Sequence, residues 1–343
     1  MSAHMITFVA VIAAFFTRTP VGNSWESDSQ RMGMAVNSSE LSEIVTGLSA
    51  EQKQISPKYF YDERGSQLFD AITQLPEYYL TNTELGIMRD SIDEIVAMVG
   101  KQASLIEFGS GSSLKTRILL QHLSELAAYV PVDISEEHLY ASAESIRSEF
   151  PHIDTLPVVA DFTKQFDLPT PMVIPVRNVV YFPGSTIGNF EHDMAMELLQ
   201  VMHHEAGKDG ALLIGVDLQK DPQIIEDAYN DSAGVTAEFN LNMLQHLNRN
   251  YGANFKVSEF EHSANYDSDV GRVVIELVSQ ADQTFEIGDS AFDIADGEAI
   301  LTEYSHKYTL DGFATMAETA GFTVRQVWTD AEQLFSVQFL TRS

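Results

Sequence analysis

Hydrophobic positions from residue 104 onwards alternate between two patterns. Short apolar and β-branched runs, typical of buried strands, occupy residues 104–108, 129–133, 156–160, 178–182 and 211–216. Amphipathic segments separate these runs, and helices are expected at 114–126, 136–149 and 193–205. Strands that alternate with helices favour parallel pairing, because parallel neighbours need a long crossover. The pattern therefore predicts an α/β fold, with a parallel sheet covered by helices on both faces.

The pattern changes after residue 217. Residues 221–251 are expected to be wholly helical, and residues 257–287 contain strands such as 272–278. This part of the chain is therefore an insertion into the α/β pattern. Together with the segment before the first strand, we expect it to form a second α+β lobe over the carboxyl ends of the strands, where open α/β sheets bind their ligands.

The C-terminal region returns to regular alternation. A helix is expected at 310–320, ending at Gly321, since glycine is favoured just after a helix. Strands at 323–328 and 335–340 follow with a short turn between them, which predicts an antiparallel hairpin. A parallel sheet closed by such a hairpin resembles the Rossmann-like architecture of class I methyltransferases.

The composition narrows the classes of partner. The 343 residues include 50 acidic and 20 basic side chains, which gives a formal net charge of -30. A surface this acidic repels phosphate backbones, so no nucleic-acid partner is expected. The absence of cysteine excludes a disulfide scaffold, a cysteine nucleophile and thiolate metal sites. It also fits a reducing compartment, and we expect a cytoplasmic protein that acts as a monomer.

The N-terminus contains one further apolar run, ITFVAVIAAFF at residues 6–16. This run has the length of a signal-peptide core but is too short to span a membrane. A secretory segment carries Lys or Arg before its apolar run, and only His4 stands there. We interpret residues 1–34 as an extension that is disordered or follows from a start assigned too early, with Met32 or Met34 as the true start; a targeting segment is the alternative. No membrane association is expected.

A glycine turn follows the first predicted strand, in the stretch LIEFGSGSSLKTRIL at residues 105–119. The dinucleotide fingerprint G-x-G-x-x-G is matched by Gly109 and Gly111, but Leu114 occupies the third glycine position. This weakens a dehydrogenase interpretation, and no P-loop motif is present. Asp133 lies 22 residues after Gly111, at the end of the second strand, where a carboxylate accepts hydrogen bonds from ribose hydroxyls. An ordinary strand-to-helix turn and a helix-capping aspartate are the structural alternatives.

A second acidic residue follows the third predicted strand. Asp161 stands beside Phe162, a pair that suits an adenine, because the carboxylate accepts from the exocyclic amine while the ring packs on the base. The glycine turn, Asp133 and Asp161–Phe162 follow three successive strands, so they are expected to meet at one edge of the sheet. The combination favours S-adenosylmethionine (SAM) over a nicotinamide dinucleotide.

Six longer stretches then resemble one known family. They are KYFYDERGSQLFDAITQLPEYYLTNTE (58–84), EFGSGSSLKT (107–116), GSTIGNF (184–190), GVDLQKDP (215–222), AYNDSAGVTAEFN (228–240) and LTEYSHKY (301–308). Together they are similar to the L-histidine Nα-methyltransferases of ergothioneine biosynthesis, over the chain from about residue 58 to the C-terminus. The resemblance implies a SAM-binding domain at 84–217 and 308–343. It also implies a substrate-binding lobe at 35–83 and 218–307.

The resemblance also implies roles for individual residues. The residues expected to bind SAM are Gly109, Gly111, Lys115, Asp133, Asp161 and Phe162. The residues expected to bind the amino-acid substrate are Tyr78, Asn189, Tyr229, Glu303 and Ser305. Within this set, Asn189 is expected to hold the α-carboxylate and amine, Tyr229 the carboxylate, and Glu303 with Ser305 the imidazole ring. Tyr61 is expected in the pocket wall, and proton loss from the amine is expected through water near Asn189 and Tyr61.

The spacing of Glu303 and Ser305 supports a ring-binding role on physical grounds. Residues two apart in a strand face the same way, about 7 Å apart, so Tyr304 would point to the other face. A neutral imidazole has one donor and one acceptor nitrogen, which a carboxylate and a hydroxyl can satisfy. An indole has an N–H and no ring acceptor, so the serine hydroxyl would lose a partner. The alternative is an exposed strand in which these residues alternate without a ligand.

The implied activity is the stepwise SAM-dependent methylation of L-histidine to Nα,Nα,Nα-trimethylhistidine (hercynine), the first step of ergothioneine biosynthesis. One departure leaves an alternative open: Ile275 stands where some members of the family have methionine beside the ring, which keeps tryptophan as an alternative substrate. A non-catalytic sensor that binds SAM and an amino acid is a second alternative. No metal site is expected, because His203 and His204 have no ligand spacing such as H-E-x-x-H.

Overall fold

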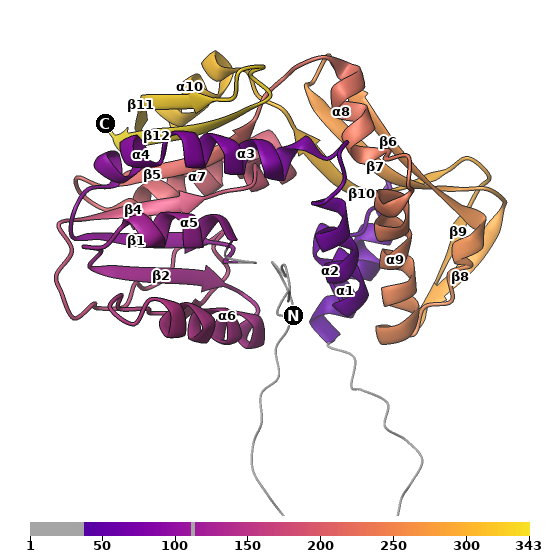
Figure 1. Cartoon of the computed structure of the whole chain (residues 1–343). Coiled ribbons are helices and arrows are strands. Elements are labelled where there is room, and N and C mark those ends of the chain that lie inside the picture. The colour runs from indigo at the N-terminus through magenta and orange to yellow at the C-terminus, as the bar shows by residue number, and fades with distance from the viewer. Residues whose placement is uncertain (1–37, 111–113) are drawn as a thin grey trace, which may run out of the picture.

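The computed structural model describes residues 38–110 and 114–343 (Figure 1). The expectations for residues 1–34, for the apolar run at 6–16 and for Gly111 concern positions outside the described residues. The described chain forms a large α/β sheet domain, on the left of Figure 1, and a second lobe of helices and small antiparallel sheets on the right. Among the described residues, no helix is both long and apolar enough to cross a bilayer.

The central sheet has seven strands in the order β11-β12-β5-β4-β1-β2-β3. The strands are β1 (Ala103–Phe108), β2 (Ala128–Asp133), β3 (Val158–Val159), β4 (Arg177–Phe182), β5 (Ala211–Asp217), β11 (Phe322–Thr329) and β12 (Phe335–Arg342). Strands β1 to β5 pair in parallel, whereas β12 is antiparallel to β5 and β11 is antiparallel to β12. The predicted parallel sheet with an antiparallel C-terminal hairpin is confirmed. Chain order reverses between β1 and β4, the position at which open sheets leave a crevice for ligands.

Helices cover both faces of this sheet. They are α3 (Tyr79–Asp90), α4 (Ile92–Val99), α5 (Leu114–His122), α6 (Glu136–Glu149), α7 (His192–Ala206) and α10 (Leu310–Thr319). Successive residues of β1 point to opposite faces, so Leu105 packs in the cluster with α3, α4, α5 and α6. Ile106 packs with α7 and α10 on the other face. Every residue of β1 and β2 is buried, which explains why both strands are mainly apolar.

The second lobe is built around helix α9. Its helical elements are α1 (Ser38–Leu48), η1 (Pro57–Phe60), α2 (Glu63–Ile72), α8 (Pro222–Tyr229), α9 (Val235–Asn250) and η3 (Val257–Glu259). Its strands are β6 (Phe260–Asp267), β7 (Arg272–Ser279), β8 (Gln283–Ile287), β9 (Ser290–Ile294) and β10 (Ala299–His306). Strands β10, β7 and β6 form one antiparallel sheet, and β8 and β9 form another. The helically spaced apolar residues Phe239, Met243, Leu244 and Leu247 are buried in the core of this lobe.

The structure departs from the predicted elements at three places. The helix predicted at 114–126 is shorter, because α5 ends at His122. Residues 221–251 are not wholly helical, because the chain breaks between α8 and α9, where Asp231 accepts hydrogen bonds from the N–H groups of Val235 and Thr236 and so caps α9. In the expected third strand at 156–160, only Val158 and Val159 form a regular strand with β2, although the N–H groups of Leu156 and Ala160 also donate to β2 carbonyls. Pro157 has no N–H to donate, which shortens this edge strand.

The expected division at residues 83/84 falls inside α3. This helix begins at Tyr79 and packs against β12 and α5, with Ile87 and Met88 in the core of the sheet domain. Figure 1 shows α3 lying along the sheet, with its first turn directed towards the second lobe. The helix therefore connects the two parts of the molecule. This position is important for the site, because the side chains of its first two turns contact residues from both parts.

Candidate active site

The glycine turn after β1 has the geometry expected for a close approach to a ligand. Gly109 has a φ of 72°, a left-handed conformation that glycine adopts at little cost. Its N–H donates to the carbonyl of Val132 at 2.9 Å, which fastens the turn to the end of β2. Only the first glycine of the motif can be placed, since Gly111 lies outside the described residues.

A buried carboxylate, Glu107, lies next to this turn. Glu107, the residue before Phe108, is only 2% exposed and accepts hydrogen bonds from the hydroxyls of Thr116, at 2.5 Å, and Tyr129. The Tyr129 hydroxyl also lies 3.1 Å from Ser110 Oγ. Burial raises the pKa of Glu107, and the hydroxyl contacts oppose this rise. The sequence interpretation missed Glu107, although it stands only two residues before Gly109.

Asp133 lies at the carboxyl end of β2, where a ribose-binding acid was expected. It is 2% exposed, and its carboxylate accepts from the N–H of Ser135 at 2.8 Å. Burial raises the pKa of Asp133 to about 7, and the charge of Glu107 adds to this rise. A buried carboxylate with a raised pKa is short of hydrogen-bond donors, and a ribose diol supplies two of them. Asp133 therefore fits the ribose of SAM.

Asp161 and Phe162 follow β3, but each already has partners within the protein. Asp161 accepts from Lys164 Nζ at 2.7 Å and from the Thr163 hydroxyl at 2.6 Å. Burial alone would raise the pKa of Asp161, but these hydrogen bonds lower it. The Phe162 ring is 4% exposed and lies 5.7 Å from the ring of Phe108. An adenine amine would replace the Lys164 contact, which is accessible because the Lys164 side chain is 78% exposed.

Lys115, the expected cofactor lysine, is held by a glutamate that the sequence interpretation did not select. Glu84 on α3 is 1% exposed and forms an ion pair with Lys115 Nζ. Both oxygens of Glu84 also accept from the N–H of Gly184 at 3.0 Å. A Cβ at Gly215 would lie 2.2 Å from a Glu84 oxygen, so only glycine leaves room there. Glu84 is the last residue of the stretch 58–84 that resembles the family. Its place in that stretch is the sequence feature from which it could have been selected.

The expected ring-binding pair lies on β10. Ser305 is 6% exposed and Glu303 is half-buried, so this segment is not the exposed alternating strand that was the structural alternative. Tyr304 points to the other face, where the Arg272 guanidinium lies 3.8 Å from its ring centre. Burial raises the pKa of Glu303 to about 7, although the charge of Lys307 opposes this rise.

Asn189 reaches this pair from the sheet domain. It ends the short helix η2 (Thr186–Asn189), and its Nδ2 donates to Glu303 Oε1 at 2.9 Å. The helix packs closely against β10, because a Cβ at Gly188 would lie 2.6 Å from the His306 carbonyl oxygen. The structure thus brings together two predicted residues that are 114 positions apart in the chain.

Three predicted tyrosines lie near the Glu303–Ser305 pair, Tyr61 and Tyr78 near Glu303 and Tyr229 at Ser305. The rings of Tyr78 and Tyr229 are 6.4 Å apart in an edge-to-face contact, and Phe69 contacts both Tyr61 and Tyr78. Burial raises the pKa of Tyr61 and of Tyr78, and the charge of Glu303 raises both further. The tyrosines are therefore neutral donors and acceptors at neutral pH. Tyr229, expected at the substrate carboxylate, has its hydroxyl 2.8 Å from Ser305 Oγ, one of the two residues expected at the ring.

A buried ion pair lies directly behind this tyrosine and serine. Lys307 Nζ donates to Tyr229 Oη and to Ser305 Oγ, both at 2.8 Å, and is 2.7 Å from Asp217 Oδ2. The side chains of Lys307 and Asp217 are both 0% exposed. The sequence interpretation selected neither residue, although Lys307 stands two positions after Ser305 in LTEYSHKY.

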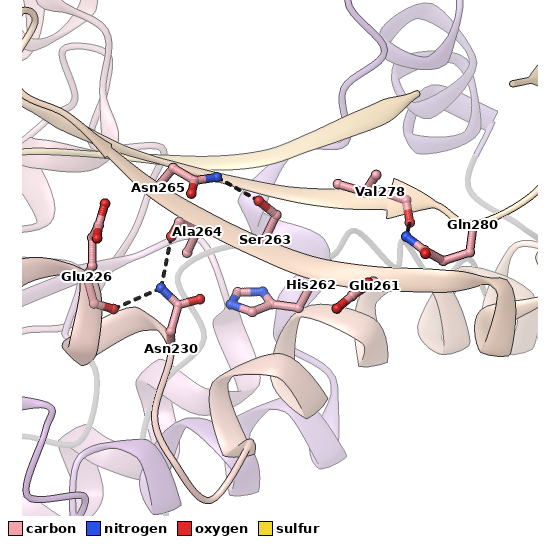
Figure 2. Close-up of a pocket in the computed structure, with 9 residues that line it drawn as sticks. All are labelled: Glu226, Asn230, Glu261, His262, Ser263, Ala264, Asn265, Val278 and Gln280. Carbon is pink, nitrogen blue, oxygen red and sulfur yellow. Dashed lines mark hydrogen bonds between the residues drawn. The ribbon is translucent and has the colours of Figure 1, made fainter. Parts of the chain in front are cut away.

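A separate polar groove of about 490 Å³ lies along the edge strand β6, beside the end of α8 (Figure 2). Asn230 lies at one end of it and donates to the carbonyl oxygens of Glu226 and Ala264, both at 2.9 Å. None of the predicted site residues lines this groove. In the described ranges, no group of three or more His, Asp and Glu side chains is arranged to hold a metal ion.

The fold and the site together define the class of protein. A parallel sheet closed by an antiparallel hairpin, with a glycine turn and a buried acid at successive strand ends, is a class I SAM-dependent methyltransferase. The chain belongs more narrowly to the family described as histidine-specific, SAM-dependent methyltransferases, whose sequence model matches residues 40–342. The family resemblance, the enzyme class and the use of SAM are thereby confirmed.

Curated relatives support this membership over most of the chain. A histidine N-alpha-methyltransferase of Mycolicibacterium smegmatis is 37% identical over 305 residues, covering 88% of this chain and 94% of the relative. A histidine N-alpha-methyltransferase of Mycobacterium tuberculosis is 36% identical over 293 residues, covering 84% of this chain and 90% of the relative. An ergothioneine biosynthesis protein 1 of Neurospora crassa is 30% identical over 298 residues, covering 85% of this chain and 33% of that longer relative.

Proposed function

We propose that this enzyme transfers methyl groups from SAM to the α-amino nitrogen of L-histidine, stepwise to hercynine, in the first step of ergothioneine biosynthesis. The single observation that supports it best is the juxtaposition of the Glu303 carboxylate and the Ser305 hydroxyl on one face of β10, with Asn189 on Glu303. The names of the relatives, histidine N-alpha-methyltransferase and ergothioneine biosynthesis protein 1, support the same substrate.

The ring of histidine suits this pair of side chains. The Glu303 carboxylate accepts from the ring N–H, and the hydroxyl pair of Ser305 and Tyr229 serves the second ring nitrogen. The ring would lie against the tyrosine wall and against Ile275, which is 4% exposed and pairs with Glu303 across β10 and β7. Each polar group of the imidazole then has a protein partner, which is the basis of selectivity in a buried site.

The amine requires orientation and a lost proton. Bound SAM supplies an activated methyl group, so the residues of the chain have only to hold the amine in line, about 3–3.5 Å from the methyl carbon. Asn189 uses its Nδ2 on Glu303, which leaves its carbonyl oxygen to accept from the amine. Free α-amines have a pKa of about 8 and are mostly protonated at neutral pH. Since its raised pKa keeps Tyr61 neutral, we assign Tyr61 to passing the proton through water rather than to direct base catalysis.

Side-by-side methylation assays test this proposal. The purified protein is incubated with SAM and histidine, tryptophan, tyrosine or phenylalanine, and the products are identified by mass spectrometry. Histidine should be preferred and should carry up to three added methyl groups. Faster methylation of tryptophan would favour the alternative that Ile275 leaves open. Binding of histidine without turnover would instead indicate a sensor. The Tyr304→Phe variant is a matched control on the opposite face of β10 and should leave the preference unchanged.

We further propose that the enzyme is a cytoplasmic monomer. One chain supplies residues of the site from both of its parts, and cysteine is absent from the sequence. Light scattering during size-exclusion chromatography tests the oligomeric state, and a stable dimer would contradict it. Cell fractionation tests the location.

A further inference from the structure

Lys307 has no contact left for a ligand, because each of its three N–H donors has a partner. The partners are the Asp217 carboxylate at 2.7 Å and the hydroxyl oxygens of Tyr229 and Ser305 at 2.8 Å each. A Lys ammonium has three donors and no acceptor. Burial alone lowers the pKa of Lys307, but the charge of Asp217 raises it above its usual value, so the ammonium stays charged. Its effect on the pocket therefore passes through the two hydroxyls.

The hydrogen bonds of these hydroxyls can be counted. Tyr229 Oη and Ser305 Oγ lie 2.8 Å apart, so one hydroxyl donates its proton to the other. The hydroxyl that accepts this bond also accepts from Lys307, and its two lone pairs are then both used. Its own proton is the one that remains to be donated. Whichever way the pair is arranged, it presents one O–H donor to the pocket.

We propose that Lys307 is a positioning residue that turns the Tyr229–Ser305 pair into a hydrogen-bond donor, so that the subsite selects a ring with an acceptor nitrogen. This inference rests on the proposed function and adds the reason for its selectivity. On one side Glu303 provides an acceptor, and on the other side the hydroxyl pair provides a donor. That arrangement matches a neutral imidazole and leaves the hydroxyl without a partner when the ring has only an N–H.

The surrounding charges allow Lys307 to be replaced without leaving a lone buried charge. Asp217 also forms an ion pair with Lys220 Nζ at 2.6 Å and accepts from the Tyr79 hydroxyl at 2.9 Å. Loss of Lys307 therefore leaves a balanced pair of Asp217 and Lys220. In the described part of the chain, Lys220 Nζ has no hydrogen bond to Tyr229 or Ser305, and it donates to Asp217 and to the Tyr79 hydroxyl. Lys220 is thus a matched control: it belongs to the same ion cluster but is not bonded to the hydroxyl pair.

The test measures discrimination between two rings. Wild type, Lys307→Met and Lys220→Met are assayed for kcat/KM with histidine and with its pyrrole analogue, in which carbon replaces the acceptor nitrogen. Wild type and Lys220→Met should prefer histidine by roughly tenfold or more, the consequence of one unpaired buried group. In Lys307→Met the preference should fall to about threefold or less, because the hydroxyl pair then has a free lone pair and can accept as well as donate. Binding of S-adenosylhomocysteine, measured by calorimetry, should be the same for all three proteins.

The outcomes separate the inference from the proposed function. If wild type does not methylate histidine, the proposed function fails and the inference fails with it. If wild type prefers histidine and Lys307→Met lowers both rates in the same proportion, or behaves as Lys220→Met does, only the inference is overturned. Should Lys307→Met lose S-adenosylhomocysteine binding through misfolding, Lys307→Gln decides the question. It keeps N–H donors in the same space without the charge, and an intermediate preference supports the inference whereas an unchanged preference contradicts it.

Discussion

Replacement of Glu303 by glutamine should change stability and activity in opposite directions. Glutamine keeps an oxygen that can accept from Asn189 Nδ2, as Glu303 Oε1 does at 2.9 Å, so the local geometry is preserved. The substitution removes the charge. It therefore also removes the free-energy cost of ionising a carboxyl at a half-buried position. The free protein should therefore become more stable above neutral pH, while its use of histidine should become weaker.

The size of the stability effect follows from the raised pKa. Burial raises the pKa of Glu303 from 4.5 to about 7, and each pKa unit is about 1.4 kcal/mol, which gives an upper limit of ~3 kcal/mol. Because Glu303 is only half-buried, solvent screening reduces this value, and we expect a gain of about 2 kcal/mol. A gain of this size is a substantial part of the stability of an ordinary domain.

The pH at which the gain occurs is fixed by linkage. A carboxyl with a raised pKa binds its proton more tightly in the folded than in the unfolded protein, so its contribution to stability is complete below about pH 4.5. That contribution is lost as the pH rises through about 7. Glutamine does not titrate. The variant should therefore be more stable than wild type at about pH 8, with a smaller difference or none at about pH 5.

Urea unfolding of both ligand-free proteins at the two pH values measures the effect. Asp133 also has a pKa of about 7, but it is present in both proteins and cancels from the comparison. The reasoning is refuted if wild type is the more stable protein at the higher pH, or if the difference between the proteins does not depend on pH. In parallel, kcat/KM for histidine should fall by tenfold or more, because a neutral amide accepts less strongly from the ring N–H than a carboxylate does.

Three further substitutions test the remaining parts of the site. Ser305→Ala should lower kcat/KM for histidine by about five- to a hundredfold through loss of a buried hydrogen bond, and equal kinetics with wild type would remove the serine from the ring subsite. Glu84→Gln should weaken binding of S-adenosylhomocysteine by roughly tenfold in calorimetry, since Lys115 loses its buried ion pair. Glu43→Gln, which breaks the more exposed pair with Lys58, is its control and should bind normally. Asp133→Asn should also lower this affinity by tenfold or more and should stabilise the ligand-free protein above about pH 7; unchanged affinity would argue against ribose binding.

Local patterns in the chain were enough to predict most of the sheet domain. The helix at 136–149 was predicted with its observed bounds, and the strands at 104–108, 129–133 and 178–182 each begin within one residue of the prediction. The period of apolar residues and the turn chemistry of Gly109 are properties of neighbouring positions, so they can be recognised without the fold. The strand at 156–160 was predicted too long because the effect of Pro157 was overlooked. The helix at 221–251 was predicted too long because the capping role of Asp231 was overlooked.

The buried partners of the site were decided by tertiary structure. Lys115 was selected from the family resemblance, but its partner Glu84 lies 31 residues earlier on another helix. Asp217 lies at the end of β5 and meets Lys307 from the second lobe together with Tyr79 from α3, 138 residues away in the chain. Such contacts depend on which strand ends and helices the topology brings to one point. A charged side chain is stable in the protein interior only when the fold places an opposite charge next to it. The partner can be distant in the chain, so a local sequence pattern does not identify it.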